Sequence, residues 1–209
     1  METASIQAAC IRNPDTAWLR ARFSQTTLER RVRLLVESPA LETPLRPASV
    51  LIPVIEREAG LTVLFTRRTE HLQTHAGQIS FPGGGAEPSD ATAIATALRE
   101  TEEEIGLLPR QVEVLGQLEE HPTVTGYRVT PVVGLIASPF DLRLDDFEVA
   151  EVFEVPLAFL LNPVNYRRDS MTRDGRLREF DAIPYGPQYI WGATAAMLLQ
   201  LHAYLSGDS

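Results

Sequence analysis

The sequence predicts an α/β domain in which a mixed β-sheet is sandwiched between helices. β-rich runs stand both before and after a central helical segment, and an apolar helix closes the chain. Helices on both faces of a sheet bury the apolar sides of both elements, so this layered arrangement is stable. A chain of 209 residues suits one such domain with a single core. We therefore expect the domain at residues 47–205, preceded by an N-terminal helical extension and linker at residues 1–46.

The N-terminal extension has a helical pattern. From Asp15 to Val36 the apolar residues recur at roughly helical spacing, with arginines between them. This pattern predicts one or two amphipathic helices. Glu37 to Pro47 is polar and rich in proline, which is typical of a linker. Amphipathic helices pack equally well on the core of their own chain or on a second subunit, so the sequence leaves a homodimer open.

The first strands are expected directly after the linker. Ala48 to Ile55 and Leu61 to Arg67 are β-rich, and the residues 56–60 between them contain a glycine, which predicts a hairpin. A polar segment then leads to a short strand at Ile79 to Phe81. Pro82 and the three glycines that follow it are expected to end this strand in a loop.

The central helix is expected after the glycine loop. Ser89 and Asp90 are candidate N-cap residues, because their short polar side chains accept hydrogen bonds from the first turn of a helix. Gly106 stands where a C-cap is expected. The apolar side of this helix would carry Ile94, Ala97 and Leu98.

Three further strands and one helical turn are expected in the second half. Gln111 to Leu118 alternates in polarity, and Tyr127 to Ile136 is rich in β-branched residues, so both segments predict strands. Pro131 lies within the second of them and indicates a bulge or an edge position. Ala150 to Val155 predicts a short strand, which a turn of helix follows at Pro156 to Leu161.

The last elements are a hairpin and a helix. Tyr166 to Arg168 and Arg178 to Ile183 are expected to pair around a turn at residues 173–175. Trp191 to Tyr204 predicts the closing helix. With the central helix and this closing helix, the sheet is expected to lie between helical layers.

The charge of the chain bounds its partners. The formal net charge is −9, which disfavours nonspecific binding to nucleic acids because they are polyanions. The sequence contains no lysine, so it can form neither a P-loop nor a Schiff base. Its positive charge is carried by arginine, which binds phosphate with two hydrogen bonds and suits a diphosphate substrate.

The apolar segments, the N-terminal residues and the cysteine content limit where the protein is expected and which cysteine chemistry it can use. The longest apolar segments are broken within about ten residues, whereas ~20 are needed to span a bilayer, so we expect no membrane association. Met1 to Cys10 lacks the basic and apolar regions of a secretory signal, and we expect a cytoplasmic protein. Cys10 is the single cysteine, which excludes an intrachain disulfide and a cysteine-based zinc site.

An acidic turn of the central helix is the strongest functional signal. Residues three and four apart share one face of a helix, so Glu100, Glu103 and Glu104 are neighbours. Such a cluster is often only a solvated face. This one lies near the C-terminal end of its helix, where the macrodipole disfavours negative charge. Mg²⁺ or Mn²⁺ would relieve the repulsion, because both ions prefer oxygen ligands and bridge carboxylates to phosphates.

The same stretch resembles the box of the Nudix hydrolase superfamily, G-x5-E-x7-R-E-U-x-E-E-x-G-U with U aliphatic. The second half of the box is matched closely, whereas the first half departs from the pattern. Counting back from the arginine places Ala91 at the acidic position, and counting forward from Gly84 places Asp90 there. Thr101 stands where the box has an aliphatic residue. The residues that match the second half are Arg99, Glu100, Glu103, Glu104, Gly106 and Leu107.

The approach to the box resembles the coenzyme A pyrophosphatases within that superfamily. The similar segment runs from Leu64 to Gly84, with Thr69 in place of the more frequent Ser or Ala and Gln73 in place of a basic residue. Shorter matches lie at residues 123–134, 148–157 and 190–195. The resemblance implies a Nudix-type α/β/α sandwich. It also implies hydrolysis of coenzyme A, or a derivative, to 3′,5′-ADP and 4′-phosphopantetheine or its acyl form.

The helical spacing of the glutamates and the family resemblance together suggest roles for the box residues. We expect Glu100 and Glu104, one turn apart, to hold the principal metal ion, and Glu103 to hold a second ion or to orient the water. The resemblance implies that the carbonyl oxygen of Gly83 is a further ligand. It also implies that Arg99 positions a catalytic glutamate through a salt bridge.

Residues outside the box are expected to bind the substrate. Arg67 and Arg68 follow a strand and would hold phosphate, although arginines there also serve to keep an edge strand soluble. His75 and Gln78 lie in the segment before the box, where substrate contacts are expected. Glu148 is a candidate general base or extra ligand, with an exposed acid before a strand as the alternative.

Two alternative functions stay open. One is a Nudix hydrolase for ADP-ribose, NADH or another nucleoside diphosphate derivative. The other, from a different class, is a catalytically silent Nudix domain that binds a nucleotide. Tyr189 and Trp191 would stack on an adenine, although aromatic residues at the start of an apolar helix more often belong to the core.

Overall fold

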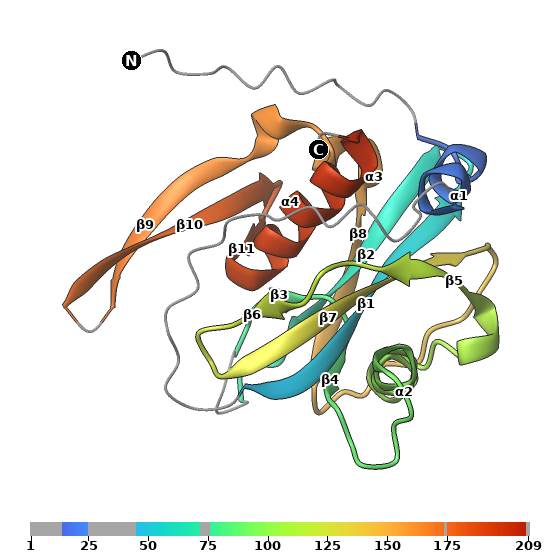
Figure 1. The fold of residues 1–209 in the computed structure, drawn as a ribbon, viewed down its shortest axis with the longest axis horizontal. Coiled ribbons are helices and arrows are strands. Elements are labelled where there is room, and N and C mark those ends of the chain that lie inside the picture. The colour runs from blue at the N-terminus through green and yellow to red at the C-terminus, as the bar shows by residue number, and fades with distance from the viewer. Residues whose placement is uncertain (1–13, 25–44, 72–75, 174, 208–209) are drawn as a thin grey trace.

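The computed structural model describes residues 14–24, 45–71, 76–173 and 175–207. Within these ranges a mixed main sheet is covered by helices on both faces, and a second, antiparallel sheet extends to one side (Figure 1). The α/β class and the mixed sheet expected from the sequence are therefore confirmed.

The main sheet is built around two long neighbouring strands. β1 (Arg46–Arg57) pairs in parallel with β7 (Tyr127–Ile136), and β7 pairs antiparallel with β5 (Val112–Gln117). β2 (Gly60–Arg68) pairs antiparallel with the second half of β1, which confirms the expected hairpin with a shorter turn. β8 (Val149–Pro156) then runs antiparallel along the outer side of β2.

The hairpin opens where the glycine-rich segment enters it. β4 (Gly83–Gly85) pairs with the first half of β1, and β3 (Ile79–Ser80) pairs with the end of β2. The expectation of a loop at the glycines was wrong. Because β2 leaves β1 there, the backbone groups of β1 need other partners, and β4 supplies them.

Smaller elements complete the main sheet. β6 (His121–Pro122) pairs with β7. Short helical turns lie at α3 (Leu157–Leu160), which confirms the expected turn after β8, and at η1 (Pro109–Gln111) and η2 (Pro163–Asn165).

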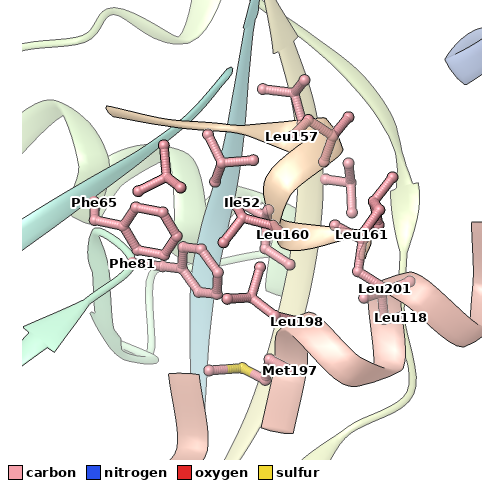
Figure 2. Close-up of a cluster of buried hydrophobic side chains, with 14 of the residues drawn as sticks. Ile52, Phe65, Phe81, Leu118, Leu157, Leu160, Leu161, Met197, Leu198 and Leu201 are labelled. Carbon is pink, nitrogen blue, oxygen red and sulfur yellow. The ribbon is translucent and has the colours of Figure 1, made fainter. Parts of the chain in front are cut away.

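Apolar side chains of β1 point alternately to two cores. Leu51 and Ile55 pack in a cluster with Ala97 and Ile105 of α2 (Ala93–Ile105). Ile52 lies in the other cluster, with α1 (Thr16–Ser24) and α4 (Gly192–Ser206). Figure 2 shows this second cluster, in which Phe65 and Phe81 stack with ring centroids 5.1 Å apart. A strand that is buried on both faces requires helices on both sides, so the sandwich follows from β1.

The second sheet consists of three antiparallel strands near the C-terminus. They are β9 (Arg167–Arg173), β10 (Arg176–Tyr185) and β11 (Gln188–Trp191). The hairpin of β9 and β10 reaches away from the body of the molecule (Figure 1). The expected hairpin is confirmed but is longer than predicted, and β11 was not predicted. Asp174 of the expected turn lies outside the described residues.

Two local expectations were wrong. The N-cap of α2 is Thr92, whose hydroxyl oxygen accepts a hydrogen bond from the backbone nitrogen of Ala95 at 3.1 Å. Pro131 lies in β7, between β1 and β5, rather than at an edge, and the register shift in the pairing with β5 falls opposite Val133 and Gly134 rather than at Pro131. It is tolerated because β5 ends at Gln117 and β6 begins at His121, so the ladder on that side of β7 is interrupted beside it.

The N-terminal extension is described only in part. Of the helices expected between Asp15 and Val36, α1 covers Thr16–Ser24, and the remainder lies outside the described residues together with most of the linker. The boundary between residues 46 and 47 stays a prediction, and Arg46 and Pro47 already belong to β1. In the described ranges, no helix combines the length and the apolar character that crossing a membrane requires.

Candidate active site

Two glutamates of the acidic turn point toward the glycine strand. α2 begins at its Thr92 cap and ends at Gly106, which has the left-handed conformation expected of a C-cap. Glu100 and Glu104 lie one turn apart on the buried side of this helix. The carboxylate of Glu104 is 7% exposed, and its Oε2 accepts a hydrogen bond from the backbone nitrogen of Gly83 at 3.1 Å.

The strand β4 leaves room for Glu100 only because it carries glycine. A Cβ atom on Gly84 would lie 2.4 Å from Oε2 of Glu100 and 2.5 Å from its carboxyl carbon. The neighbouring Gly85 has open space at the same position. Gly84 therefore allows close contact between β4 and α2, which a side chain would prevent.

Arg68 joins two carboxylates that come from distant parts of the chain. Its Nη1 lies 3.5 Å from Oε1 of Glu104, and its Nη2 lies 3.3 Å from Oε2 of Glu148. Glu148 precedes β8, and the loop before it is attached to α2, because the backbone nitrogen of Asp145 donates to the carbonyl oxygen of Glu104 at 2.9 Å. The sequence prediction named all three side chains, and the structure brings them together.

Burial makes the carboxylates of Glu104 and Glu100 harder to ionise. Desolvation raises the pKa of Glu104 to about 8, against the opposing effects of the Gly83 hydrogen bond and of Arg68. Desolvation also raises the pKa of Glu100. The charges of nearby glutamates, Glu148 among them, add to both shifts. A site that disfavours its own negative charge in this way is prepared to accept a cation.

Arg99 connects the loop before α2 to the acidic turn. Its guanidinium makes two hydrogen bonds to Asp90, at 3.1 and 2.9 Å, and a third to the carbonyl oxygen of Gly85 at 3.1 Å. It also forms ion pairs with Glu100 at 3.1 Å and with Glu103 at 2.9 Å. The carboxylate of Glu103 is 58% exposed, so it lies at the outer side of the cluster.

Asp90 is a site residue whose role was not predicted. It was considered as an N-cap, but its carboxylate instead accepts hydrogen bonds from Arg99, from the hydroxyl of Thr96 and from the backbone of Glu87. The hydrogen bonds from Arg99 lower the pKa of Asp90 strongly. Counting forward from Gly84 places Asp90 at the acidic position of the box, and this was the sequence signal that could have identified it as a site residue.

Other predicted residues lie elsewhere or are not described. Arg67 points to the opposite face of β2 from Arg68 and binds Glu151 at 2.8 Å and the side chain of Gln188. The carbonyl oxygen of Gln78 accepts a hydrogen bond from the backbone nitrogen of Arg68 at 3.0 Å, just before β3. His75 lies outside the described residues.

The donor atoms of the cluster fit a hard divalent ion. They are carboxylate oxygens, which Mg²⁺ and Mn²⁺ prefer, and two of the carboxylates have raised pKa values. In the described part of the chain, no three side chains of His, Cys, Asp or Glu are already grouped so that they could hold a metal ion. Arg68 and Arg99 pair with the carboxylates instead, so binding an ion would require Glu100 and Glu104 to exchange these partners.

Sequence comparisons with known proteins identify relatives of this chain. The family model described as the NUDIX domain matches residues 45–174. NudL of Escherichia coli (strain K12), named an uncharacterized Nudix hydrolase, is 45% identical over 157 residues, which are 75% of this chain and 81% of NudL. NudL of Shigella boydii serotype 18 is 44% identical over the same length, with the same coverage of both chains.

Solved structures were also matched, at lower sequence identity and with TM-scores below 0.5. A NUDIX hydrolase from Alicyclobacillus acidocaldarius is 20% identical, with a TM-score of 0.48 over 78% of this chain and 93% of that one. A MutT NUDIX hydrolase from Burkholderia pseudomallei is 18% identical, with a TM-score of 0.47 over 77% and 99%. Because the NUDIX match covers more than half of the sequence and the NudL relatives cover most of it, this chain belongs to the Nudix hydrolase family.

Proposed function

We propose that this chain is a metal-dependent hydrolase that cleaves the diphosphate of coenzyme A or its derivatives. The observation that carries the proposal is that Arg68 joins Glu104 to Glu148, while Glu100, one helical turn from Glu104, lies against Gly84 of the glycine strand. The carboxylates offer oxygen ligands for a cation, and Arg68 offers a group that binds phosphate. The products would be 3′,5′-ADP and 4′-phosphopantetheine, or its acyl form.

Members of the family use divalent metal ions, and we assign Mg²⁺ or Mn²⁺ to this site. Glu100 and Glu104 would hold the principal ion, and the carbonyl oxygen of Gly83 would add a main-chain ligand. When bound, the ion would neutralise charge on the diphosphate and lower the pKa of the attacking water. Exposed Glu103, which pairs with Arg99, is less desolvated and would hold a second ion or orient the water.

Side chains of the site would orient the phosphate and accept the proton of the attacking water. The water oxygen bonds to one phosphorus atom, the bond from that phosphorus to the bridging oxygen breaks, and the leaving phosphate keeps the bonding electrons. Glu148 would accept the proton of the water, because it stands across Arg68 from Glu104 and is partly open to solvent. Arg68 would turn from the carboxylates to a phosphate oxygen, and Arg99 would hold Glu100 in place.

The substrate class is supported by the segment before the box. The resemblance to coenzyme A pyrophosphatases covers Leu64 to Gly84, whose described residues include the second half of β2, the strand β3 and the start of β4. Both Arg68 and Gly84, which contact the carboxylates, come from this segment. The segment whose resemblance supports a coenzyme A substrate therefore supplies residues to the site that we propose for hydrolysis.

A substrate panel tests the proposal against its alternatives. The purified chain would be incubated with Mn²⁺ and, separately, coenzyme A, an acyl-coenzyme A, NADH and ADP-ribose, and the products identified by mass spectrometry. Cleavage of the coenzyme A compounds at the highest kcat/KM is expected. Preferred cleavage of NADH or ADP-ribose would favour the other nucleoside diphosphate substrates. Tight binding without any product would favour a silent nucleotide-binding domain.

A further inference from the structure

An exposed aromatic side chain stands beside the proposed general base. Phe147 precedes Glu148 in the chain, and its side chain is 64% exposed. The ring of His71 lies against it, with centroids 4.8 Å apart and planes inclined by 58°. Single exposed apolar side chains are common on protein surfaces. What distinguishes Phe147 is its place next to Glu148, which contacts Arg68, so its open face is available to a ligand of the candidate active site.

The loop that carries Phe147 is fixed on both sides. The backbone nitrogen of Phe147 donates to the carboxylate of Asp145 at 2.9 Å, and its carbonyl oxygen accepts from the hydroxyl of Thr69 at 2.8 Å. The backbone nitrogen of Asp145 is itself bonded to the carbonyl oxygen of Glu104 at the end of α2. The backbone of Phe147 is therefore held relative to both α2 and the end of β2, so the loop would lose little further conformational entropy when a ligand binds.

The aromatic residues expected from the sequence to stack on a base have other partners. The hydroxyl of Tyr189 is hydrogen-bonded to Asp169, and Trp191 packs on Phe180 with ring centroids 5.2 Å apart. Both belong to β11, in the second sheet. Phe147, in contrast, is one residue from a side chain that contacts Arg68.

We propose that Phe147, supported by His71, is a stacking platform for the purine base of the substrate. This subsite rests on the proposed function, because it gives one end of a nucleoside diphosphate compound a place beside the diphosphate-binding Arg68. A flat base offers its π-face to an aromatic ring whatever its hydrogen-bonding edge, whereas the flexible pantetheine chain does not. Stacking of this kind is worth roughly a tenfold change in affinity, with a range of about 5- to 150-fold.

A pair of ligands that differ only in the base tests the platform directly. Binding of AMP and of ribose 5-phosphate would be measured by isothermal titration calorimetry for the unchanged chain, Phe147→Ala and Phe147→Trp. Both ligands carry the same sugar phosphate, so the ratio of their affinities isolates the base. The matched control is Leu177→Ala, which removes another exposed apolar side chain on the distant hairpin.

The expected result is about tenfold tighter binding of AMP than of ribose 5-phosphate by the unchanged chain. Phe147→Ala should abolish this preference, and Phe147→Trp and Leu177→Ala should keep it. The proposal is overturned if the unchanged chain does not prefer AMP, or if Phe147→Ala keeps the preference.

Kinetics separate this proposal from the function on which it rests. If coenzyme A is hydrolysed, Phe147→Ala should raise its KM about tenfold and change kcat by less than about twofold, because the platform binds the ground state and the transition state alike. The chain could also prefer AMP through Phe147 and yet cleave no substrate. That result would contradict the proposed hydrolysis but would support the platform. Hydrolysis with a KM that Phe147→Ala does not change would contradict the platform alone.

Discussion

The guanidinium of Arg99 donates two hydrogen bonds to the carboxylate of Asp90, from Nε to Oδ1 at 3.1 Å and from Nη2 to Oδ2 at 2.9 Å. The side chain of Asp90 is 6% exposed, and the same guanidinium also pairs with Glu100 and Glu103. One arginine thus joins the loop before α2 to the acidic turn at its end. The planar, two-point contact fixes the direction of Arg99 as well as its charge.

Replacing Asp90 with Asn should make stability less dependent on acid pH. Arg99 lowers the pKa of Asp90 below its unfolded value of about 3.9, so its contribution to stability is fully present above that pH and is lost as the pH falls through the folded pKa. The unfolding free energy from urea titrations should differ between the two proteins at pH 7, and this difference should shrink below about pH 4. A difference that stays constant down to pH 3 would contradict the role of this ion pair.

Replacing Gly84 with Ala should remove activity and keep the fold. The new methyl group would lie 2.4 Å from Oε2 of Glu100, and the flexible carboxylate would move away rather than the strand. We expect kcat/KM to fall at least about 100-fold, because a misplaced catalytic group costs that much. The matched control is Gly85→Ala, whose methyl group meets nothing within 4 Å. Equal activity of the two variants would show that the position of Glu100 is not critical.

Replacing Glu104 with Gln should abolish metal-dependent turnover. The amide keeps the shape of the buried side chain but loses the charge that we assign to the ion, so kcat should fall at least about 100-fold. Mn²⁺ titration calorimetry should show weaker binding, and circular dichroism an unchanged fold. Glu102→Gln is the control, because Glu102 lies on the exposed face of the same turn. The assignment fails if both variants bind Mn²⁺ and turn over equally.

Replacing Thr101 with Val should leave both stability and activity nearly unchanged. Thr101 stands where the box has an aliphatic residue, and it is fully buried with its hydroxyl donating to the carbonyl oxygen of Ala97 at 2.6 Å. Removing that hydroxyl costs one modest hydrogen bond and gains an apolar contact, so the unfolding free energy should change by less than about 1 kcal/mol. A loss of more than about 2 kcal/mol in thermal or urea unfolding would mean that the hydroxyl has a larger role.

Local periodicity was enough to predict the main elements and the acidic turn. The spacing of Glu100 and Glu104 puts them on one face of any helix that contains both, and Gly106 marks the end of that helix. The start of the helix was predicted wrongly because Ser89, Asp90 and Thr92 are all good N-caps. Arg99, nine residues beyond Asp90, decides between them by taking the carboxylate of Asp90.

Pairing between distant segments could not be predicted from local patterns. The glycines of β4 form a strand only because β1 and β2 separate beside them, and β11 exists only because β10 offers an edge. The contact of Arg68 with both Glu104 and Glu148 joins three segments, and nothing in the sequence predicted that these side chains meet. The exposed Phe147 gave no sequence signal, because a single aromatic residue in a loop has no periodic pattern.

The most direct test of the central claim is the rate at which coenzyme A is cleaved with Mn²⁺, with the products identified by mass spectrometry. We predict that the unchanged chain releases 3′,5′-ADP and 4′-phosphopantetheine in equal amounts, and that Gly85→Ala does so at the same rate. Gly84→Ala and Glu104→Gln should give at least about 100-fold less of both. No cleavage of coenzyme A or acyl-coenzyme A by the unchanged chain, or full cleavage by Glu104→Gln, would contradict the claim.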